Sequence, residues 1–383
     1  MPGTANGSNI AYALKGWFVP IDSSAVGLLS GGRNGRSDYL NFLTTVNEPQ
    51  VGKSFESMKP YALFPRTPGL FSSLNVQKNM LQDQVRNRAF KEAIFRNVNR
   101  GDVVIDLGTG TGILAIWAAQ AGAKKVYAIE ETDVADIAEA VIKDNGFENV
   151  ITVLKANSSE VTLPEPADVL IAELVGHFLF EEGIVEAVAA VREALLKPAA
   201  RVIPNSASVF AAPVELNGEF DEVRFWNTWS DPVLSAVRKK AANSAYVEKV
   251  SPGVLVSEAA KLFEIDFRTV RPALLSSESS FLIDRECCLD AIVGWFKLSL
   301  DSDAYVETAP WSPATHWQQC IFPLEQQFQL KKSETLHFEM TLEPFASGSK
   351  WKWEILTSES QQWEAHEFEI TYGVDARLMK ERF

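Results

Sequence analysis

The chain has 383 residues, of which 46% are hydrophobic and 22% are charged, and its formal net charge is −14. This composition is typical of a globular protein, and the length allows two or three packed units. The negative charge argues against direct binding to nucleic acid phosphates and favours cationic partners, although acidity can equally serve solubility alone.

The sequence contains no apolar stretch of the length that a membrane span requires, and its first residues lack the order of a signal peptide. Three cysteines are too few for a disulfide framework. The four histidines are scattered and do not have the spacing of metal ligands. We therefore expect a cytoplasmic protein, with the nucleus as a second location, that binds no metal, membrane or nucleic acid directly.

The first part of the chain, residues 1–55, is rich in glycine, serine, asparagine and threonine and shows no sustained periodicity. We expect it to be a flexible arm. Residues 76–97 repeat apolar side chains at helical spacing, which predicts at least one amphipathic helix.

Residues 56–205 are predicted to form a domain with a doubly wound parallel sheet. Between residues 102 and 204, short apolar runs alternate with helical stretches, and this alternation is typical of such a sheet. The runs predict strands at 103–105, 126–129, 151–154 and 169–171 and helices at 113–121, 134–142 and 184–196.

Residues 206–383 change to a period of two, with apolar and polar side chains alternating along several short runs. This pattern predicts an antiparallel β-barrel or sandwich. The segment near 217–250 breaks the pattern, reads as partly helical and carries Phe225, Trp226 and Trp229. These aromatics are interpreted as part of a protruding dimerisation arm, with packing in the core as an equal alternative.

A glycine-rich loop, GTGTG at residues 108–112, follows the first predicted strand and precedes a helix. Glycines let the backbone approach a ligand closely, and the helix N-terminus favours a polar or anionic group. A dinucleotide fingerprint would place its third glycine where Ile113 stands, so a dehydrogenase is the weaker interpretation. Glu130 ends the second strand, where a carboxylate can accept both ribose hydroxyls. The loop therefore predicts a nucleoside site.

The loop and its two strand-end acids resemble the first motifs of class I methyltransferases, whose methyl donor is S-adenosylmethionine and whose product is S-adenosyl-L-homocysteine. The resemblance implies a Rossmann-like fold for this domain. It also implies that the cofactor is held by Asp106, Gly108, Gly110 and Glu130 and that its adenine is contacted by Ser158 and Ser159.

Two acids, Glu173 and Glu182, lie on either side of an apolar loop that follows the fourth predicted strand. Open α/β sheets bind their ligands at this edge. An arginine side chain keeps its charge at any working pH and offers a rigid fork of donors, so two converging carboxylates can hold it bidentately. Glu181 is adjacent and could take the role of Glu182. The segment therefore predicts a site for a guanidinium group.

The same segment resembles the double-glutamate loop of protein arginine methyltransferases. Residues 80–86 are similar to the helix that precedes the cofactor motif in that family, and residues 315–317 are similar to its Thr-His-Trp loop. Taken without the family, His316 reads more readily as a structural residue.

The family resemblance implies roles for further residues. The implied catalytic residues are Glu173, Glu182, His316 and Asp83, the last two forming a pair. Arg86 would bind the carboxylate of the cofactor. Met80 would contact the cofactor and would also line the acceptor pocket. The implied contacts to the substrate are Phe71, Glu181, Thr315 and Trp317.

Thr67 and Phe71 stand where dimethylating members of the family carry paired tyrosines, and several motifs are most similar to the monomethylating, type III branch. We therefore expect monomethylation of arginine in histone tails and glycine/arginine-rich RNA-binding proteins, by a homodimer. The alternatives are a dimethylating enzyme of the same family, a small-molecule methyltransferase, and a non-catalytic scaffold.

Overall fold

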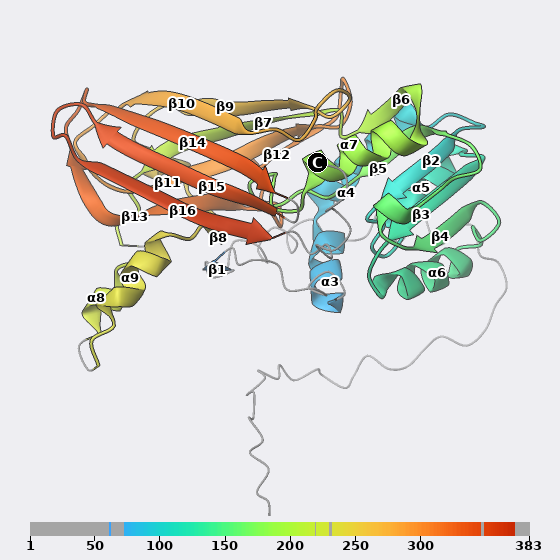
Figure 1. Ribbon diagram of the computed structural model, residues 1–383, viewed down its shortest axis with the longest axis horizontal. Coiled ribbons are helices and arrows are strands. Elements are labelled where there is room, and N and C mark those ends of the chain that lie inside the picture. Colours follow the sequence, from blue (N-terminus) through green and yellow to red (C-terminus); the bar gives the residue numbers. More distant parts are fainter. Residues whose placement is uncertain (1–60, 63–72, 219, 230–231, 346–347, 372–383) are drawn as a thin grey trace, which may run out of the picture. The chain divides into compact units, whose positions relative to one another are not determined.

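The computed structural model describes residues 61–62, 73–218, 220–229, 232–345 and 348–371 (Figure 1). All of these residues belong to one compact unit. The expected flexible arm at residues 1–55 and the predicted substrate contact Phe71 lie outside them. No helix within the described ranges is long and apolar enough to cross a membrane.

Five parallel strands form a sheet in the order β4-β3-β2-β5-β6. The strands are β2 (Val103–Leu107), β3 (Lys125–Glu130), β4 (Ile151–Lys155), β5 (Ala167–Ala172) and β6 (Leu196–Ile203). The four strands predicted from the apolar runs are confirmed. The pattern does not predict β6, because exposed residues at 197–199, including Pro198, interrupt its apolar run. The strand order reverses between β2 and β5, and open α/β sheets bind ligands at such a point.

Helices connect these strands as the sequence predicts. They are α5 (Ile113–Ala121), α6 (Val134–Asp144) and α7 (Ile184–Leu195). The stretch predicted as helical at 76–97 forms two helices, α3 (Leu74–Gln82) and α4 (Gln84–Asn97). The break falls at Asp83, whose backbone is extended and whose side chain accepts a hydrogen bond from the backbone N–H of Arg86 at 2.9 Å. Aspartate is a favoured N-cap, which explains why a new helix begins there.

The second half of the described chain is antiparallel β structure, as predicted. One sheet has the order β1-β8-β13-β11-β7-β9, with β12 on β11, and the other has the order β10-β14-β15-β16. The first contains β1 (Tyr61–Ala62), β7 (Ser206–Val214), β8 (Tyr246–Glu248), β9 (Ala260–Asp266), β11 (Cys287–Ser299), β12 (Tyr305–Glu307) and β13 (Gln319–Leu330). The second contains β10 (Leu275–Leu282), β14 (Thr335–Phe345), β15 (Gly348–Thr357) and β16 (Trp363–Thr371).

The two antiparallel sheets enclose an aromatic core in a barrel-like arrangement. Alternate residues of β14 and β15 are buried, among them Trp351 and Trp353, and the ring centroid of Phe322 in β13 lies 5.3 Å from that of Trp353. The sheets also meet at an edge, where the carboxylate of Glu364 accepts the backbone N–H of Glu325 at 2.5 Å. Period-two burial of large apolar side chains therefore explains this half of the fold.

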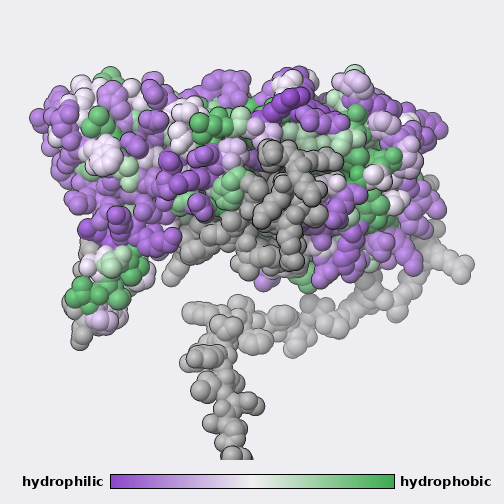
Figure 2. Space-filling model, viewed as in Figure 1, coloured by the Kyte–Doolittle hydropathy of each residue, from purple (hydrophilic) through white to green (hydrophobic). Residues whose placement is uncertain are grey.

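A short helical arm, α8 (Phe225–Thr228) and α9 (Ser235–Ala242), protrudes from the β domain (Figure 1). Its base is held by ion pairs of Arg224 with Asp290, which is 4% exposed, and of Arg238 with Glu325 at 2.9 Å. Its outer part carries hydrophobic residues (Figure 2). The most exposed of these are Phe225 (41%), Trp229 (49%) and Val233 (73%).

Candidate active site

The loop after β2 depends on two glycines. Gly108 and Gly110 have φ angles of +71° and +54°, in the left-handed region that L side chains rarely adopt. A Cβ atom at Gly108 would lie 2.6 Å from Cδ2 of Leu174, and one at Gly110 would lie 2.9 Å from Oε1 of Gln77. The loop thus passes close to α3 and to the segment after β5, and a larger residue at either position would have a strained backbone and would displace Leu174 or Gln77.

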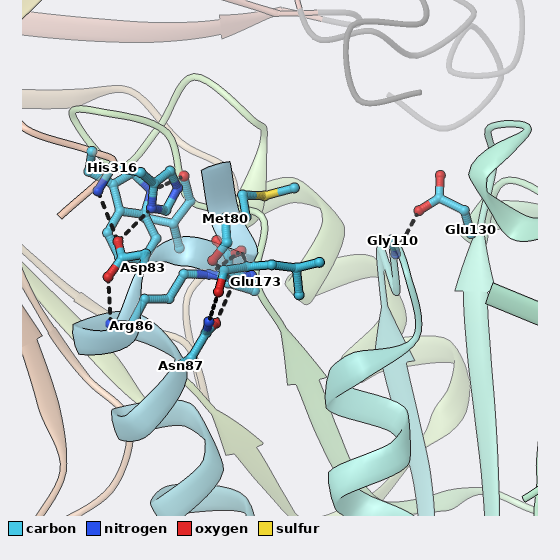
Figure 3. A network of polar contacts seen from close by, with 11 residues as sticks. Met80, Asp83, Arg86, Asn87, Gly110, Glu130, Glu173 and His316 are labelled. Carbon is cyan, nitrogen blue, oxygen red and sulfur yellow. Dashed lines mark hydrogen bonds and ion pairs between the residues drawn. The ribbon is translucent and has the colours of Figure 1, made fainter. Parts of the chain in front are cut away.

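Glu130 ends β3 beside this loop and is 8% exposed. Its Oε2 atom accepts the backbone N–H of Gly110 at 3.1 Å, and its Oε1 atom accepts the N–H and the hydroxyl of Thr132 at 2.9 and 2.7 Å. Figure 3 shows this contact with Gly110 at the mouth of the loop. The carboxylate is therefore fixed where the sequence predicts a ribose-binding acid.

Asp106, in β2, is completely buried. Its Oδ2 atom accepts the hydroxyl of Thr109 at 2.6 Å, whereas Oδ1 has no partner of hydrogen-bond geometry among the described residues. Burial raises the pKa of Asp106 to about 7, against the opposing effects of the Thr109 hydrogen bond, the backbone N–H of Ala115 and the charge of Arg86, and the negative charge of Glu130 adds to the rise. A cationic group near Oδ1 would favour the charged carboxylate.

A short turn follows β4 beside Glu130. The backbone N–H of Ala156 donates to the carbonyl of Glu130 at 3.1 Å, and Asn157 caps the turn by accepting the N–H and hydroxyl of Ser159 at 3.0 and 2.7 Å. Asn157 also donates to Glu131 at 2.9 Å. The structure therefore places Ser158 and Ser159 next to the end of β3, as their predicted contact with adenine requires.

The most buried ion pair near the strand ends joins Arg86 of α4 to Glu173, the residue after β5 (Figure 3). Both side chains are 6% exposed. Nε and Nη2 of Arg86 both donate to Oε2 of Glu173, the former at 2.9 Å. Nη1 donates to the carbonyl of Met80 at 3.1 Å and to the side chain of Asn87 at 2.9 Å. The predicted cofactor-binding arginine and the predicted acceptor-binding glutamate are thus in direct contact.

Asp83 and His316 form the predicted pair between α4 and the β domain. Oδ2 of Asp83 accepts the backbone N–H of His316 at 2.9 Å and lies 2.8 Å from its Nδ1 atom. Burial alone would raise the pKa of Asp83, but the hydrogen bonds and charge of His316, with the N–H of Arg86, outweigh it and lower that pKa. The pair therefore favours a charged Asp83 at neutral pH.

The loop between Glu173 and Glu182 folds back on itself. Gly176 and Leu179 exchange backbone hydrogen bonds at 3.3 and 3.2 Å and form an isolated antiparallel bridge. Glu173 and Glu182 each lie three residues outside this bridge, one on either arm of the turn. The two glutamates therefore lie at matching positions on the two arms, and the convergence of their carboxylates on one ligand stays a prediction.

Other predicted substrate residues are buried parts of the same loops. Glu181 is 3% exposed, and its Oε1 atom accepts the backbone N–H of Phe178 at 2.7 Å, so it braces the turn from within. Thr315 and Trp317 are both 1% exposed, and Nε1 of Trp317 donates to the carbonyl of Val175 at 2.7 Å. Their roles toward the substrate remain predictions.

Two polar residues of the site lie outside the sequence prediction. Asn87, 9% exposed, accepts a hydrogen bond from Arg86 and donates to the carbonyl of Leu81 at 2.8 Å. Asparagine has a low helix propensity, so its position inside the predicted helix is a signal in the sequence for a specific role of this residue. Glu131 binds Asn157, and burial raises its pKa. An acid directly after Glu130 gives no separate signal, because two adjacent acids are common on exposed loops.

The residues fit S-adenosylmethionine as a ligand. The glycines let the loop backbone approach a ligand closely, Glu130 stands at the adjacent strand end, and the buried Oδ1 of Asp106 matches the cationic amino group of the methionine part. No group of three or more potential metal ligands occurs within the described part of the chain.

The chain has sequence relatives among the protein arginine methyltransferases. Protein arginine N-methyltransferase 1 of Chlamydomonas reinhardtii is 31% identical over 73% of this chain and 84% of its own length, and that of Oryza sativa subsp. indica is 33% identical over 72% and 73%. The family model of the arginine methyltransferase oligomerization subdomain matches residues 205–352. That of the ribosomal protein L11 methyltransferase (PrmA) matches residues 90–199.

Solved structures have the same fold. A Trypanosoma brucei PRMT1 enzyme-prozyme heterotetrameric complex with AdoHcy superposes with a TM-score of 0.72 at 26% identity, covering 79% of this chain and 99% of that one. Arabidopsis thaliana protein arginine methyltransferase 10 gives 0.65 at 26% identity, covering 79% and 98%. Fold and strand-end site together define an S-adenosylmethionine-dependent methyltransferase. Within that class, the chain belongs to the protein arginine N-methyltransferase family.

Replacing Asp106 with asparagine should change how stability depends on pH. The carboxyl group has a pKa of about 7 in the folded protein and an ordinary value of 3.8. The folded state therefore holds the proton more tightly, and the resulting stabilisation is complete below about pH 4 and is lost as pH rises to about 7. Urea unfolding should show wild type losing up to roughly 4 kcal/mol relative to Asp106→Asn across this window. Parallel pH profiles would contradict the assignment.

Proposed function

We propose that the protein transfers a methyl group from S-adenosylmethionine to a guanidinium nitrogen of arginine in basic protein segments. The observation that carries the proposal is that Glu173 already binds a guanidinium group. Its Oε2 atom accepts two N–H groups of Arg86, and its Oε1 atom accepts no hydrogen bond from the described residues. A carboxylate at this edge of the sheet can therefore hold a second guanidinium beside the predicted methyl donor.

The proposed chemistry is an in-line displacement. Bound S-adenosylmethionine would supply a methyl group on a sulfonium, which a guanidinium nitrogen could displace in line, so that an N–C bond would form as the C–S bond broke and S-adenosylhomocysteine would leave as the thioether. Glu173 and Glu182 attract the positive charge toward the other two nitrogens and away from the attacking one. Positioning supplies most of the rate enhancement, because the two reactants are held in contact.

The methylated guanidinium sheds one proton as the bond forms. His316, held by Asp83 at 2.8 Å, is proposed to receive that proton or to pass it to solvent. Because the pKa of Asp83 is lowered, its carboxylate stays charged at neutral pH and can stabilise a protonated imidazole.

The finer proposal is that transfer stops at monomethylarginine and that the substrates are histone tails and glycine/arginine-rich segments. The net charge of −14 supports basic substrates through long-range attraction. The type III product is supported by the sequence resemblance, with Thr67 and Phe71 in place of paired tyrosines.

Incubation of a glycine/arginine-rich peptide with the protein and S-adenosylmethionine should give monomethylarginine, detected by mass spectrometry. Glu173→Gln should lower the rate by roughly 100-fold or more, because it removes the charge that orients the guanidinium. Dimethylarginine would keep the family activity and overturn the product assignment. No arginine methylation of any basic peptide would overturn the proposed function.

The matched control is Glu139→Gln, an equivalent change on the exposed face of α6. Its rate should equal that of wild type. Thermal unfolding of both variants is needed as well, because Glu173→Gln leaves the buried Arg86 without its carboxylate and such a change is costly.

The ion pair between Arg86 and Glu173 couples the two predicted ligand sites. Nε–H and Nη2–H of Arg86 both donate to the same oxygen, Oε2, of Glu173. The amino-acid carboxylate of a bound cofactor would draw Arg86 away from Glu173. Both oxygens of Glu173 could then bind the guanidinium group of the substrate. Arginine-containing peptide should then bind more tightly when a ligand with an amino-acid carboxylate is present.

Titration calorimetry should show the peptide binding roughly tenfold more tightly with S-adenosylhomocysteine than with methylthioadenosine, which has the same nucleoside but no amino-acid carboxylate. The difference should disappear in Arg86→Gln. Equal affinity with both nucleosides in wild type would show that the ion pair does not couple the sites.

The arm is proposed to join two copies of this chain. The half-exposed aromatic residues on the protruding arm are expected to pack against a partner surface. The match of residues 205–352 to an oligomerization subdomain supports a second copy of the chain as that partner. The ion pairs of Arg224 and Arg238 at its base fix the direction in which the arm points.

Light scattering after size-exclusion chromatography should give the mass of a dimer for wild type and of a monomer for Trp229→Ser combined with Val233→Ser, since these changes remove exposed apolar area from the arm. Trp363→Ser, which replaces a 61% exposed tryptophan on β16, is the control and should remain dimeric. A double variant that stays dimeric would exclude the arm as the interface.

A further inference from the structure

His177 lies in the turn between Glu173 and Glu182 and has no role in the predicted chemistry. Its Nδ1 atom is 2.8 Å from the carbonyl oxygen of Trp317. A carbonyl oxygen can only accept a hydrogen bond, so Nδ1 is the donor and carries the hydrogen. The contact joins two segments that are 140 residues apart.

Trp317 also donates in the opposite direction. Its indole Nε1 gives a hydrogen bond to the carbonyl of Val175 at 2.7 Å, two residues before His177. The indole is 1% exposed and packs against the ring of His316 with centroids 4.2 Å apart. Two hydrogen bonds of opposite direction therefore tie the glutamate loop to the segment that carries His316.

The tip of the glutamate loop has a separate anchor. Phe178 is completely buried in the β domain, where its ring centroid lies 5.1 Å from that of Phe322 and 5.6 Å from that of Trp351. A Cβ atom at Gly294 would lie 2.3 Å from its ring, so the packing is tight. This anchor does not involve the imidazole of His177, so the loop should stay inserted when that side chain changes.

We propose that His177 is a positioning residue, which sets the direction of Glu173 relative to His316 by holding the glutamate loop against Trp317. The proposal rests on the proposed function, since it assigns the loop to acceptor binding. Packing of Phe178 against Phe322 and Trp351, and of Phe180 against Phe263 with ring centroids 5.8 Å apart, fixes where the tip of the loop sits. The paired hydrogen bonds of His177 and Trp317 set the tilt of the loop against the segment that carries His316. A continuous path of contacts then runs from Asp83 through His316 and Trp317 to His177.

Three substitutions test this role. In His177→Asn, the side-chain nitrogen takes about the place of Nδ1 and can still donate to Trp317. In His177→Gln, the nitrogen takes about the place of Nε2, and in His177→Leu the donor is absent. We expect kcat/KM for the peptide to fall roughly threefold to tenfold in the Gln and Leu variants, by the value of one hydrogen bond, and to stay near wild type in the Asn variant.

Hydrogen exchange gives a readout that does not depend on activity. Amide protection of residues 172–183 should fall in the Gln and Leu variants and be kept in the Asn variant. The affinity for methylthioadenosine, which lacks the amino-acid carboxylate that Arg86 is predicted to bind, should be equal in all four proteins, because Glu130 and the glycine loop are untouched. If His177→Leu does not fold, the comparison of Asn with Gln still decides the question.

Equal behaviour of the Asn and Gln variants, either both impaired or both like wild type, would overturn the proposal. A wild-type protein without arginine methylation would instead overturn the proposed function, and the exchange pattern would still report whether His177 holds the loop.

Discussion

The carboxylate of Asp83 forms three hydrogen bonds and joins the start of α4 to the β domain. One oxygen begins α4 by accepting the N–H of Arg86, and the other accepts both the N–H and the ring nitrogen of His316 from the β domain. Because α4 begins there, Arg86 lies in its first turn and reaches Glu173 at the end of β5. The geometry of the predicted catalytic centre thus depends on a single helix cap that is 1% exposed. Losing it would remove a cap, a buried ion-pair partner and a contact between the domains together.

The two predicted ligand regions differ in their buried charges. Where the acceptor is expected, Glu173 faces Arg86 and Asp83 faces His316, so each carboxylate has a nitrogen partner. In the cofactor region, Asp106 is completely buried and forms no ion pair among the described residues, and its pKa is raised to about 7. A nearby cation therefore stabilises the charged form of Asp106 more than it stabilises an acid that is already in an ion pair.

The sequence predicts the fold where side-chain periodicity is strong and predicts least where backbone geometry decides. The buried runs of β2 to β5, the helices α5 to α7 and the alternating strands β14 to β16 follow directly from apolar spacing. Strand β6 escapes that pattern because Pro198 and its neighbours are exposed. The pairing of Asp83 with His316 follows from the family resemblance, as two residues 233 positions apart give no local signal. The contact of Arg86 with Glu173, and that of His177 with Trp317, could not be predicted, because both depend on how separate loops meet in space.

The bridge between Gly176 and Leu179 makes the glutamate loop intolerant of changes in length. Among the described residues, only this bridge pairs the two arms, and Glu173 and Glu182 each lie three residues from it, so one added residue on either arm would displace its glutamate while leaving the other in place. A matching insertion on the second arm would be needed to restore the relative positions of the two glutamates. The packing of Phe178 against Phe322 and Trp351 in the β domain would not accommodate that insertion. Variation in this loop is therefore expected as exchange of side chains at constant length, because a longer or shorter loop would no longer hold Glu173 and Glu182 at matching positions on its two arms.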